Sequence, residues 1–138
     1  MLRIHKKIYK DLVDHALKDA PIEACGYLGE TDGLIDAILP MKNFDHSSEH
    51  LSLDPVEQSE KIKELRRIGK KAAAVYHSHP VTLAHPSEED IRLAVDPVLS
   101  YVIVSLAGKA PVVKSFQILK TIPVEEPIEI VTNTAGGN

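Results

Sequence analysis

The sequence predicts an α/β fold in which a single mixed β-sheet is flanked by two long helices and one short helix. Two observations carry the prediction. Residues 6–20 and 54–70 repeat their apolar side chains at helical spacing. Residues 72–76 and 99–106 are short, almost wholly apolar runs of the kind found in buried strands. A chain of 138 residues is long enough for one such domain with its own core.

The N-terminal part is expected to hold a strand, a helix and a hairpin. Residues 2–4 alternate apolar and polar side chains, as a short strand does. The helix over 6–20 stops at Pro21, because proline breaks a helix interior. Residues 22–29 and 34–39 then form two strands joined by a Thr-Asp-Gly turn.

The middle of the chain begins with a polar loop over residues 40–49. A short strand is expected at 50–53. Asp54 and Pro55 follow as the N-cap and first residue of the second long helix, since Asp caps helices well and proline suits the N1 position.

The C-terminal part should contain the short helix over residues 87–95 and further strands at 99–106 and 112–119. Residues 122–131 are expected to add one terminal edge strand, interrupted by two prolines. Residues 1–131 then make up a single domain, and 132–138 a flexible tail.

Composition excludes several classes of function. The net charge is −4 and no basic run stands out, which argues against nucleic acid and anionic membranes as partners. No apolar run approaches the roughly eighteen residues of a membrane span, and no signal peptide is recognisable. The single cysteine cannot form an internal disulfide or a Cys-rich zinc site. These features predict a cytoplasmic protein.

One stretch combines residue types that bind metals. His77 and His79 end the strand that follows residue 71, and side chains two apart in a strand share a face. Ser78 therefore points away from them. Ser87 has the character of a helix N-cap, which places Asp90 in the first turn, where it can face the two histidines. Two His and one carboxylate are the ligands of a catalytic zinc that keeps one position for water.

Each part of this pattern also has an ordinary explanation. A His-x-His pair arises often by chance in a chain with seven histidines, and a Ser-x-x-Asp pair alone is a capping box. His85, His46 and His50 are expected to be loop histidines, and Cys25 a buried strand residue. The complete order of strand, His-x-His-Pro, a gap of seven residues, Ser-x-x-Asp and helix is much rarer by chance.

The motif resembles that of the JAMM (MPN-plus) zinc metalloproteases. It consists of His77-Ser78-His79, seven intervening residues and Ser87-x-x-Asp90, with the upstream run Glu23-Ala24-Cys25-Gly26-Tyr27-Leu28-Gly29 as the setting of the family's glutamate. The resemblance covers about residues 1–120. It implies an MPN/JAMM-like fold, which in turn resembles cytidine deaminase architecture.

The resemblance also implies roles for the site residues. His77, His79 and Asp90 would bind one Zn²⁺ per chain, Glu23 would be the general acid/base, and Ser87 would help to hold the oxyanion. Zinc lowers the pKa of a bound water from about 15.7 toward 7.

Two assignments stay open from the residues themselves. Spacing alone does not separate Glu23 from Glu30 or Asp36 as the acid/base. The His-His-Asp set could also take iron or cobalt.

By this resemblance the chain is a zinc peptidase or isopeptidase of the small, stand-alone prokaryotic type. Its substrate would be the amide bond after the C-terminal Gly-Gly of a ubiquitin-like or sulfur-carrier protein. A non-catalytic MPN-type binding module and a small-molecule zinc amidohydrolase are the alternatives. The partner, the residue released and any role of Gly136-Gly137-Asn138 stay open, and an exposed sheet edge would permit a homodimer.

Overall fold

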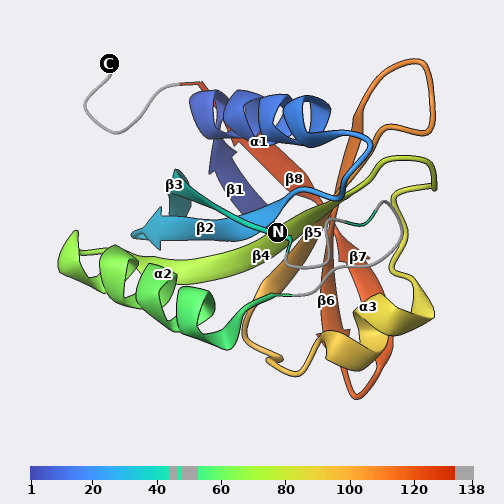
Figure 1. Cartoon of the computed structure of the whole chain (residues 1–138). Coiled ribbons are helices and arrows are strands. Elements are labelled where there is room, and N and C mark those ends of the chain that lie inside the picture. Colours follow the sequence, from blue (N-terminus) through green and yellow to red (C-terminus); the bar gives the residue numbers. More distant parts are fainter. Residues whose placement is uncertain (44–46, 48–52, 133–138) are drawn as a thin grey trace.

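The protein, as a computed structural model that describes residues 1–43, 47 and 53–132, is built on one β-sheet. Its strands are β1 (Leu2–His5), β2 (Cys25–Thr31), β3 (Leu34–Met41), β4 (Lys71–His79), β5 (Ser100–Ser105), β6 (Val112–Leu119), β7 (Ile122–Glu126) and β8 (Ile128–Val131). They lie in the order β7-β6-β5-β4-β2-β3-β1-β8 (Figure 1). Parallel and antiparallel neighbours both occur, so the predicted mixed sheet is confirmed.

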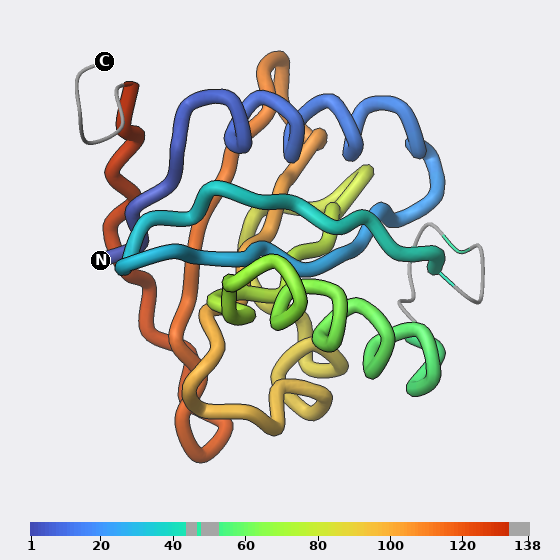
Figure 2. Tube along the Cα trace, turned by 90° about the vertical axis from the view of Figure 1, so that its left-hand side faces the viewer, coloured from blue at the N-terminus to red at the C-terminus, as the bar shows by residue number. Residues whose placement is uncertain are grey.

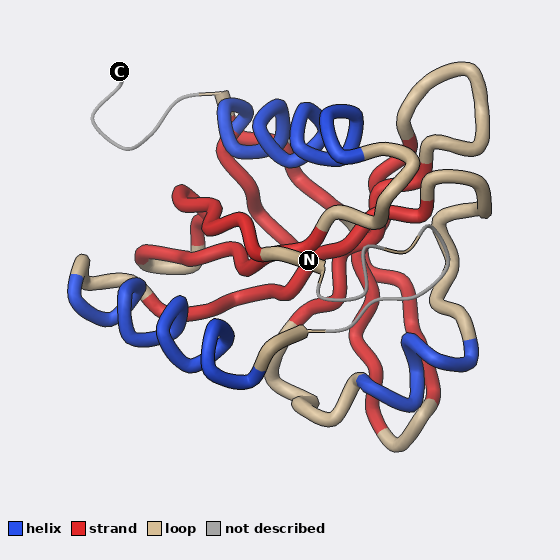
Figure 3. The backbone as a smooth tube through the Cα atoms, in the orientation of Figure 1, coloured by secondary structure: helices blue, strands red, loops and turns tan. Residues whose placement is uncertain are grey.

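Three helices in the described part of the chain flank the sheet. They are α1 (Lys6–Asp19), α2 (Pro55–Arg67) and the short α3 (Glu88–Leu93). Helix α1 lies over one face, and α2 and α3 lie over the other (Figures 2 and 3). This agrees with the predicted two long helices and one short helix.

The helices begin where the sequence indicates. Asp54 caps α2 by accepting the N–H of Val56 at 3.0 Å, and Pro55 occupies the first helical turn. Helix α3 begins after Ser87, which forms a capping box with Asp90. The capping box at the start of α3 therefore fixes the position of the Asp90 carboxylate beside the sheet.

Each face of the sheet has its own apolar core. Under α1, the cluster includes Leu12 and Ala16 from the helix and Tyr76 from β4. Under α2 it includes Leu65, and near α3 a third cluster forms around Phe116. The side chains of β4 therefore reach into different cores on its two faces, as expected for a central strand.

Gly26 of β2 lies directly against the aromatic ring of Tyr76. A Cβ atom at Gly26 would lie 2.6 Å from the Tyr76 hydroxyl oxygen, well inside van der Waals contact, and it would also meet the carbonyl of Leu39. Only glycine fits where two strands and this ring pack so closely.

Two predictions about strands are wrong. Strand β2 begins at Cys25 and not at residue 22, so Glu23 precedes the strand. The expected single edge strand over 122–131 is two strands, β7 and β8, on opposite edges of the sheet. Pro127 separates them, and its carbonyl accepts the N–H of Leu2 at 2.8 Å. The sheet therefore curls until its two edges meet at this proline.

Some predictions fall on residues that the structure does not describe: those for His46, His50, the strand at 50–53 except Leu53, and the tail from residue 133. Among the described residues, no helix is long and apolar enough to cross a membrane. The division into residues 1–131 and a tail, the homodimer through a sheet edge, and the likeness to cytidine deaminase architecture stay predictions.

Candidate metal centre

Strand β4 brings two histidines to one end of the sheet. His77 lies opposite Cys25 of β2 and Ile103 of β5, and both His77 and His79 are buried. As predicted, their rings lie side by side, with centroids 5.0 Å apart and the two Nε2 atoms 3.1 Å apart.

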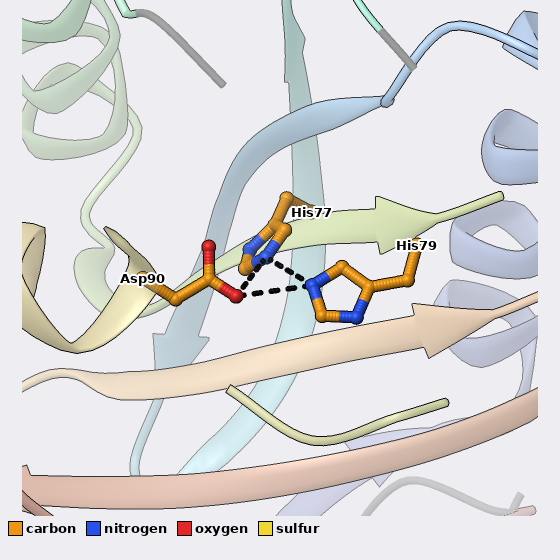
Figure 4. A group of neighbouring side chains, drawn as sticks. All are labelled: His77, His79 and Asp90. Atoms are coloured by element: carbon orange, nitrogen blue, oxygen red, sulfur yellow. Dashed lines mark hydrogen bonds and ion pairs between the residues drawn. The ribbon is translucent and has the colours of Figure 1, made fainter. Parts of the chain in front are cut away.

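Asp90 faces these rings from the first turn of α3. Its Oδ2 atom lies 3.1 Å from Nε2 of His77 and 3.0 Å from Nε2 of His79 (Figure 4). The capping box holds it there, because the Ser87 N–H donates to Oδ2 at 2.9 Å and the Asp90 N–H donates to Ser87 Oγ at 3.0 Å. The cap and a ligand role for Asp90 are therefore compatible.

The three facing atoms fit a tetrahedral zinc ion. Ligands at about 2.0–2.1 Å from zinc lie about 3.3 Å from one another at the tetrahedral angle. The three separations of 3.0–3.1 Å come close to this value. The donor set of two imidazoles and one carboxylate is also one that zinc accepts.

The hydrogen bond made by Nδ1 of His79 leaves the lone pair of its Nε2 atom available to bind a cation between His77, His79 and Asp90. Its Nδ1 lies 2.8 Å from the carbonyl oxygen of Leu83, which can only accept, so Nδ1 carries the proton. In the neutral ring Nε2 then presents a lone pair toward Asp90 Oδ2 and His77. Such a hydrogen bond from the far ring nitrogen is the usual support of a metal-binding histidine.

The charges of the site shift two of these pKa values. Burial alone would raise the pKa of Asp90, but its hydrogen bonds with His77 and His79 hold that pKa far below the ordinary value. Burial alone would lower the pKa of His79, but its hydrogen bonds to Asp90 and Leu83 outweigh burial and raise it. Without a metal, Asp90 therefore stays ionised and favours a positive charge beside it.

Glu23 is a buried carboxyl beside this group, with 5% of its surface exposed. Burial raises its pKa to about 7, opposed by the nearby His77 and His79 and reinforced by Asp90. A carboxyl that titrates near neutrality can both accept and donate a proton.

The structure separates Glu23 from the two other acids that spacing left open. Glu30 lies opposite Lys71, at the far end of β4 from the histidines. Asp36 pairs with the Lys70 ammonium at 2.9 Å. Glu23, by contrast, is close enough to His77, His79 and Asp90 for their charges to act on it.

Other singled-out residues have structural places. Ser87 is exposed at the helix cap. The Cys25 thiol is fully buried and donates to the Met41 carbonyl at 3.6 Å, and burial raises its pKa to about 12, so it is a poor nucleophile. His85 is an exposed loop residue, as expected, with its ring edge against Phe116.

No sequence pattern predicts that the backbone carbonyl of Leu83 accepts the hydrogen bond from Nδ1 of His79. Its contribution is a backbone carbonyl, which any residue type could provide, so no sequence signal marks it.

Comparison with known proteins agrees with this geometry. Residues 5–119 match the family model of prokaryotic homologues of the JAB domain. The chain is 32% identical over 134 residues to a CysO-cysteine peptidase of Mycobacterium tuberculosis, covering 95% of this chain and 92% of that protein. It is 31% identical over 96 residues to a probable TtuB-protein conjugate cleaving protease of Thermus thermophilus, covering 68% and 64%.

Solved structures share the fold. The protein DSY2949 of Desulfitobacterium hafniense has a TM-score of 0.88 at 42% identity, with 99% of this chain and 97% of that chain covered. A JAB1/MPN domain protein of Archaeoglobus fulgidus, AF2198, has a TM-score of 0.66 at 20% identity, with 94% and 97% covered. The chain therefore belongs to the prokaryotic JAB-domain family, the JAMM/MPN type that its motif resembles, and it is a hydrolase of the peptidase class.

Proposed function

We propose that the protein is a zinc peptidase that cuts the amide bond after the C-terminal Gly-Gly of a ubiquitin-like sulfur-carrier protein. The main support is the convergence of three atoms, His77 Nε2, His79 Nε2 and Asp90 Oδ2. They lie 3.0–3.1 Å from one another, close to the separation of two ligand atoms on the same zinc ion. These three atoms would bind the ion. Zinc, when bound, supplies the Lewis acidity that makes water nucleophilic near neutral pH.

Glu23 is the residue that we assign to proton transfer. It accepts the proton of the attacking water and then donates it to the nitrogen of the leaving amine, so that the amide C–N bond breaks and a carboxylate and an amine are released. Its burial supports this role, because a pKa of about 7 suits both steps at neutral pH.

Ser87 is a candidate donor to the oxyanion. Its Oγ accepts the Asp90 N–H, which leaves the hydroxyl proton available to donate. A hydroxyl beside the ligand set can stabilise the negative charge that develops on the carbonyl oxygen.

The substrate class is supported by the names of the relatives. One is named a CysO-cysteine peptidase and the other a probable TtuB-protein conjugate cleaving protease. The CysO-cysteine peptidase is matched over nearly its full length. We therefore propose a carrier protein with a single added amino acid, cysteine first, as the preferred substrate.

Mass spectrometry of a panel of ubiquitin-fold carriers tests the proposal. Each carrier ends in Gly-Gly plus one residue and is incubated with the zinc-loaded protein or with Glu23→Gln. We expect loss of the added residue with the wild type and a rate lower by about 10²- to 10⁴-fold with Glu23→Gln.

Equal cleavage by both proteins would remove Glu23 from the proton-transfer role. Absence of cleavage of every carrier by a protein that does bind zinc would favour a small-molecule amidohydrolase. Absence of both zinc and cleavage would favour an MPN-type binding module.

A further inference from the structure

The segment that carries Glu23 lies outside the sheet and needs its own support. Strand β2 begins at Cys25, two residues later. The Glu23 N–H donates to the Ser47 carbonyl at 2.8 Å, and the Ile22 N–H donates to the Asp19 carbonyl at 2.9 Å. These contacts fix the start of the segment, and a different residue, Ser78, fixes its end.

Ser78 holds Ala24 by two hydrogen bonds. The Ser78 N–H donates to the Ala24 carbonyl at 2.9 Å, and the Ala24 N–H donates to Ser78 Oγ at 2.8 Å. Both residues have 1% of their surface exposed. Neither group can therefore turn to water if the other is removed.

The second bond replaces one that a regular ladder would make. The register pairs Cys25 with His77, so Ala24 and Ser78 are the next residues directly opposite each other. Opposed antiparallel residues alternate between pairs that exchange two backbone hydrogen bonds and pairs that exchange none, and the bond from the Ser78 N–H to the Ala24 carbonyl makes this pair one of the first kind. Here the Ala24 N–H meets the serine hydroxyl in place of the Ser78 carbonyl. The regular ladder thus ends at this pair, immediately next to Glu23 in the chain.

We propose that Ser78 is a positioning residue that fixes Glu23 relative to the metal ligands. Ser78 lies between His77 and His79 in the chain, and Ala24 is the immediate neighbour of Glu23. One residue therefore couples the backbone of the acid/base to the backbone of both histidines. This inference rests on the proposed role of Glu23.

The hydroxyl is what the proposal requires. Alanine at position 78 keeps the backbone bond but leaves the buried N–H of Ala24 without an acceptor, which favours a shift of the segment. Threonine keeps the hydroxyl. Small displacements matter, because a misplacement of about 1 Å can cost about 100-fold in rate.

The test compares Ser78→Ala with Ser78→Thr and with a control, Ser115→Ala. Ser115 is another fully buried serine whose hydroxyl donates to Glu126 at 2.9 Å, away from the site. The zinc-loaded proteins are assayed on a carrier ending in Gly-Gly-Cys. We expect Ser78→Ala to lower kcat by about 10- to 100-fold with KM and zinc content little changed. Ser78→Thr should recover most of kcat, and Ser115→Ala should keep it.

A double variant tests whether Ser78 acts through Glu23. If it does, Ser78→Ala causes no further loss in the Glu23→Gln background, because the two changes remove the same contribution. An equal loss in both backgrounds would overturn the proposal, and so would loss of zinc from Ser78→Ala alone.

Amide hydrogen exchange of the metal-free proteins gives a readout that needs no cleavage. In Ser78→Ala the amides of Glu23 and Ala24 should exchange faster, while that of Tyr76 stays protected. Unchanged protection of Ala24 would overturn the proposal. If the wild type cut no carrier, the proposed substrate would be wrong, and the exchange data would still decide whether Ser78 holds the segment of Glu23.

Discussion

Strand β4 presents Tyr76 and Ser78 to one face of the sheet and His77 and His79 to the other. On the α1 face, the Tyr76 hydroxyl lies 2.7 Å from Nδ1 of His15, and Ser78 Oγ accepts the Ala24 N–H. On the opposite face, two imidazole nitrogens and a carboxylate oxygen all point at one another. The first face pairs donors with acceptors, whereas the second brings three potential metal ligands together at one point.

One strand therefore contributes internally hydrogen-bonded polar groups to one face of the sheet and the proposed metal ligands to the other. The α1 face can be satisfied by the protein alone, because each polar group there has a complementary partner. On the histidine face, the two imidazoles and the Asp90 carboxylate would together bind the cation that we propose. Changes on the two faces should therefore differ in their effect on metal binding: those at the ligands on the histidine face should weaken it, and those on the α1 face should leave it intact.

Among the changes on the histidine face, Asp90→Asn should cause the largest loss of zinc affinity. The asparagine oxygen can still accept the Ser87 N–H, so α3 is expected to stay folded. The negative charge of the ligand is lost, and zinc affinity should fall by more than the roughly 10- to 100-fold that loss of an outer-shell partner costs. Zinc titration by calorimetry measures this. Unchanged affinity would mean that Asp90 is a cap only.

The pH dependence of stability should reveal the buried Glu23. Its pKa is about 7 in the folded protein against an ordinary value of 4.5, so the unfolded state releases the proton first as pH rises. The metal-free wild type should thus lose stability between pH 4.5 and 7, by up to about 3 kcal/mol relative to Glu23→Gln, and keep that deficit above pH 7. Urea unfolding of both proteins across this range measures the difference. Parallel curves would contradict the burial of Glu23.

Gly26→Ala should act on the opposite face, and on stability. The new methyl group would press on the buried Tyr76 hydroxyl, at a cost of about 1–3 kcal/mol in the free energy of unfolding. Zinc stoichiometry should stay at one per chain. Gly108→Ala is the matched control, because a Cβ there meets nothing closer than 3.9 Å. Equal unfolding free energies for the two variants would show that the fit around Gly26 is loose.

Ser87→Ala should have the smallest effect on stability of this series. Removing the cap of α3 typically costs about 1 kcal/mol. Ser59→Ala, at an exposed serine within α2, provides the comparison and should change the unfolding free energy by less. A cost no larger than that of Ser59→Ala would mean that the Ser87 hydroxyl does not stabilise the helix start.

Patterns among residues close in sequence predicted most of the helices and strands and the grouping of His77, His79 and Asp90. Helix caps at Asp54 and Ser87, and the alternation of His77 and His79, are set by neighbours in sequence, and the structure agrees with them. The placement of β7 and β8 on opposite edges depends on how the whole sheet curls around Pro127, which no local pattern encodes.

Sequence spacing could not identify which carboxyl group is the candidate acid/base. The sequence pattern predicts Glu23 within a strand, but it lies before β2, next to Ala24, whose N–H donates to the Ser78 hydroxyl. Its choice over Glu30 or Asp36 came from the family resemblance, because burial beside a distant pair of histidines is a long-range property.

X-ray absorption at the zinc edge tests the proposed metal centre itself. We expect one zinc per chain, with two imidazole nitrogens and oxygen ligands at about 2.0–2.1 Å, and loss of this signal in His77→Ala and His79→Ala. A protein that takes up no stoichiometric zinc, or that keeps the same zinc environment in both variants, would contradict it.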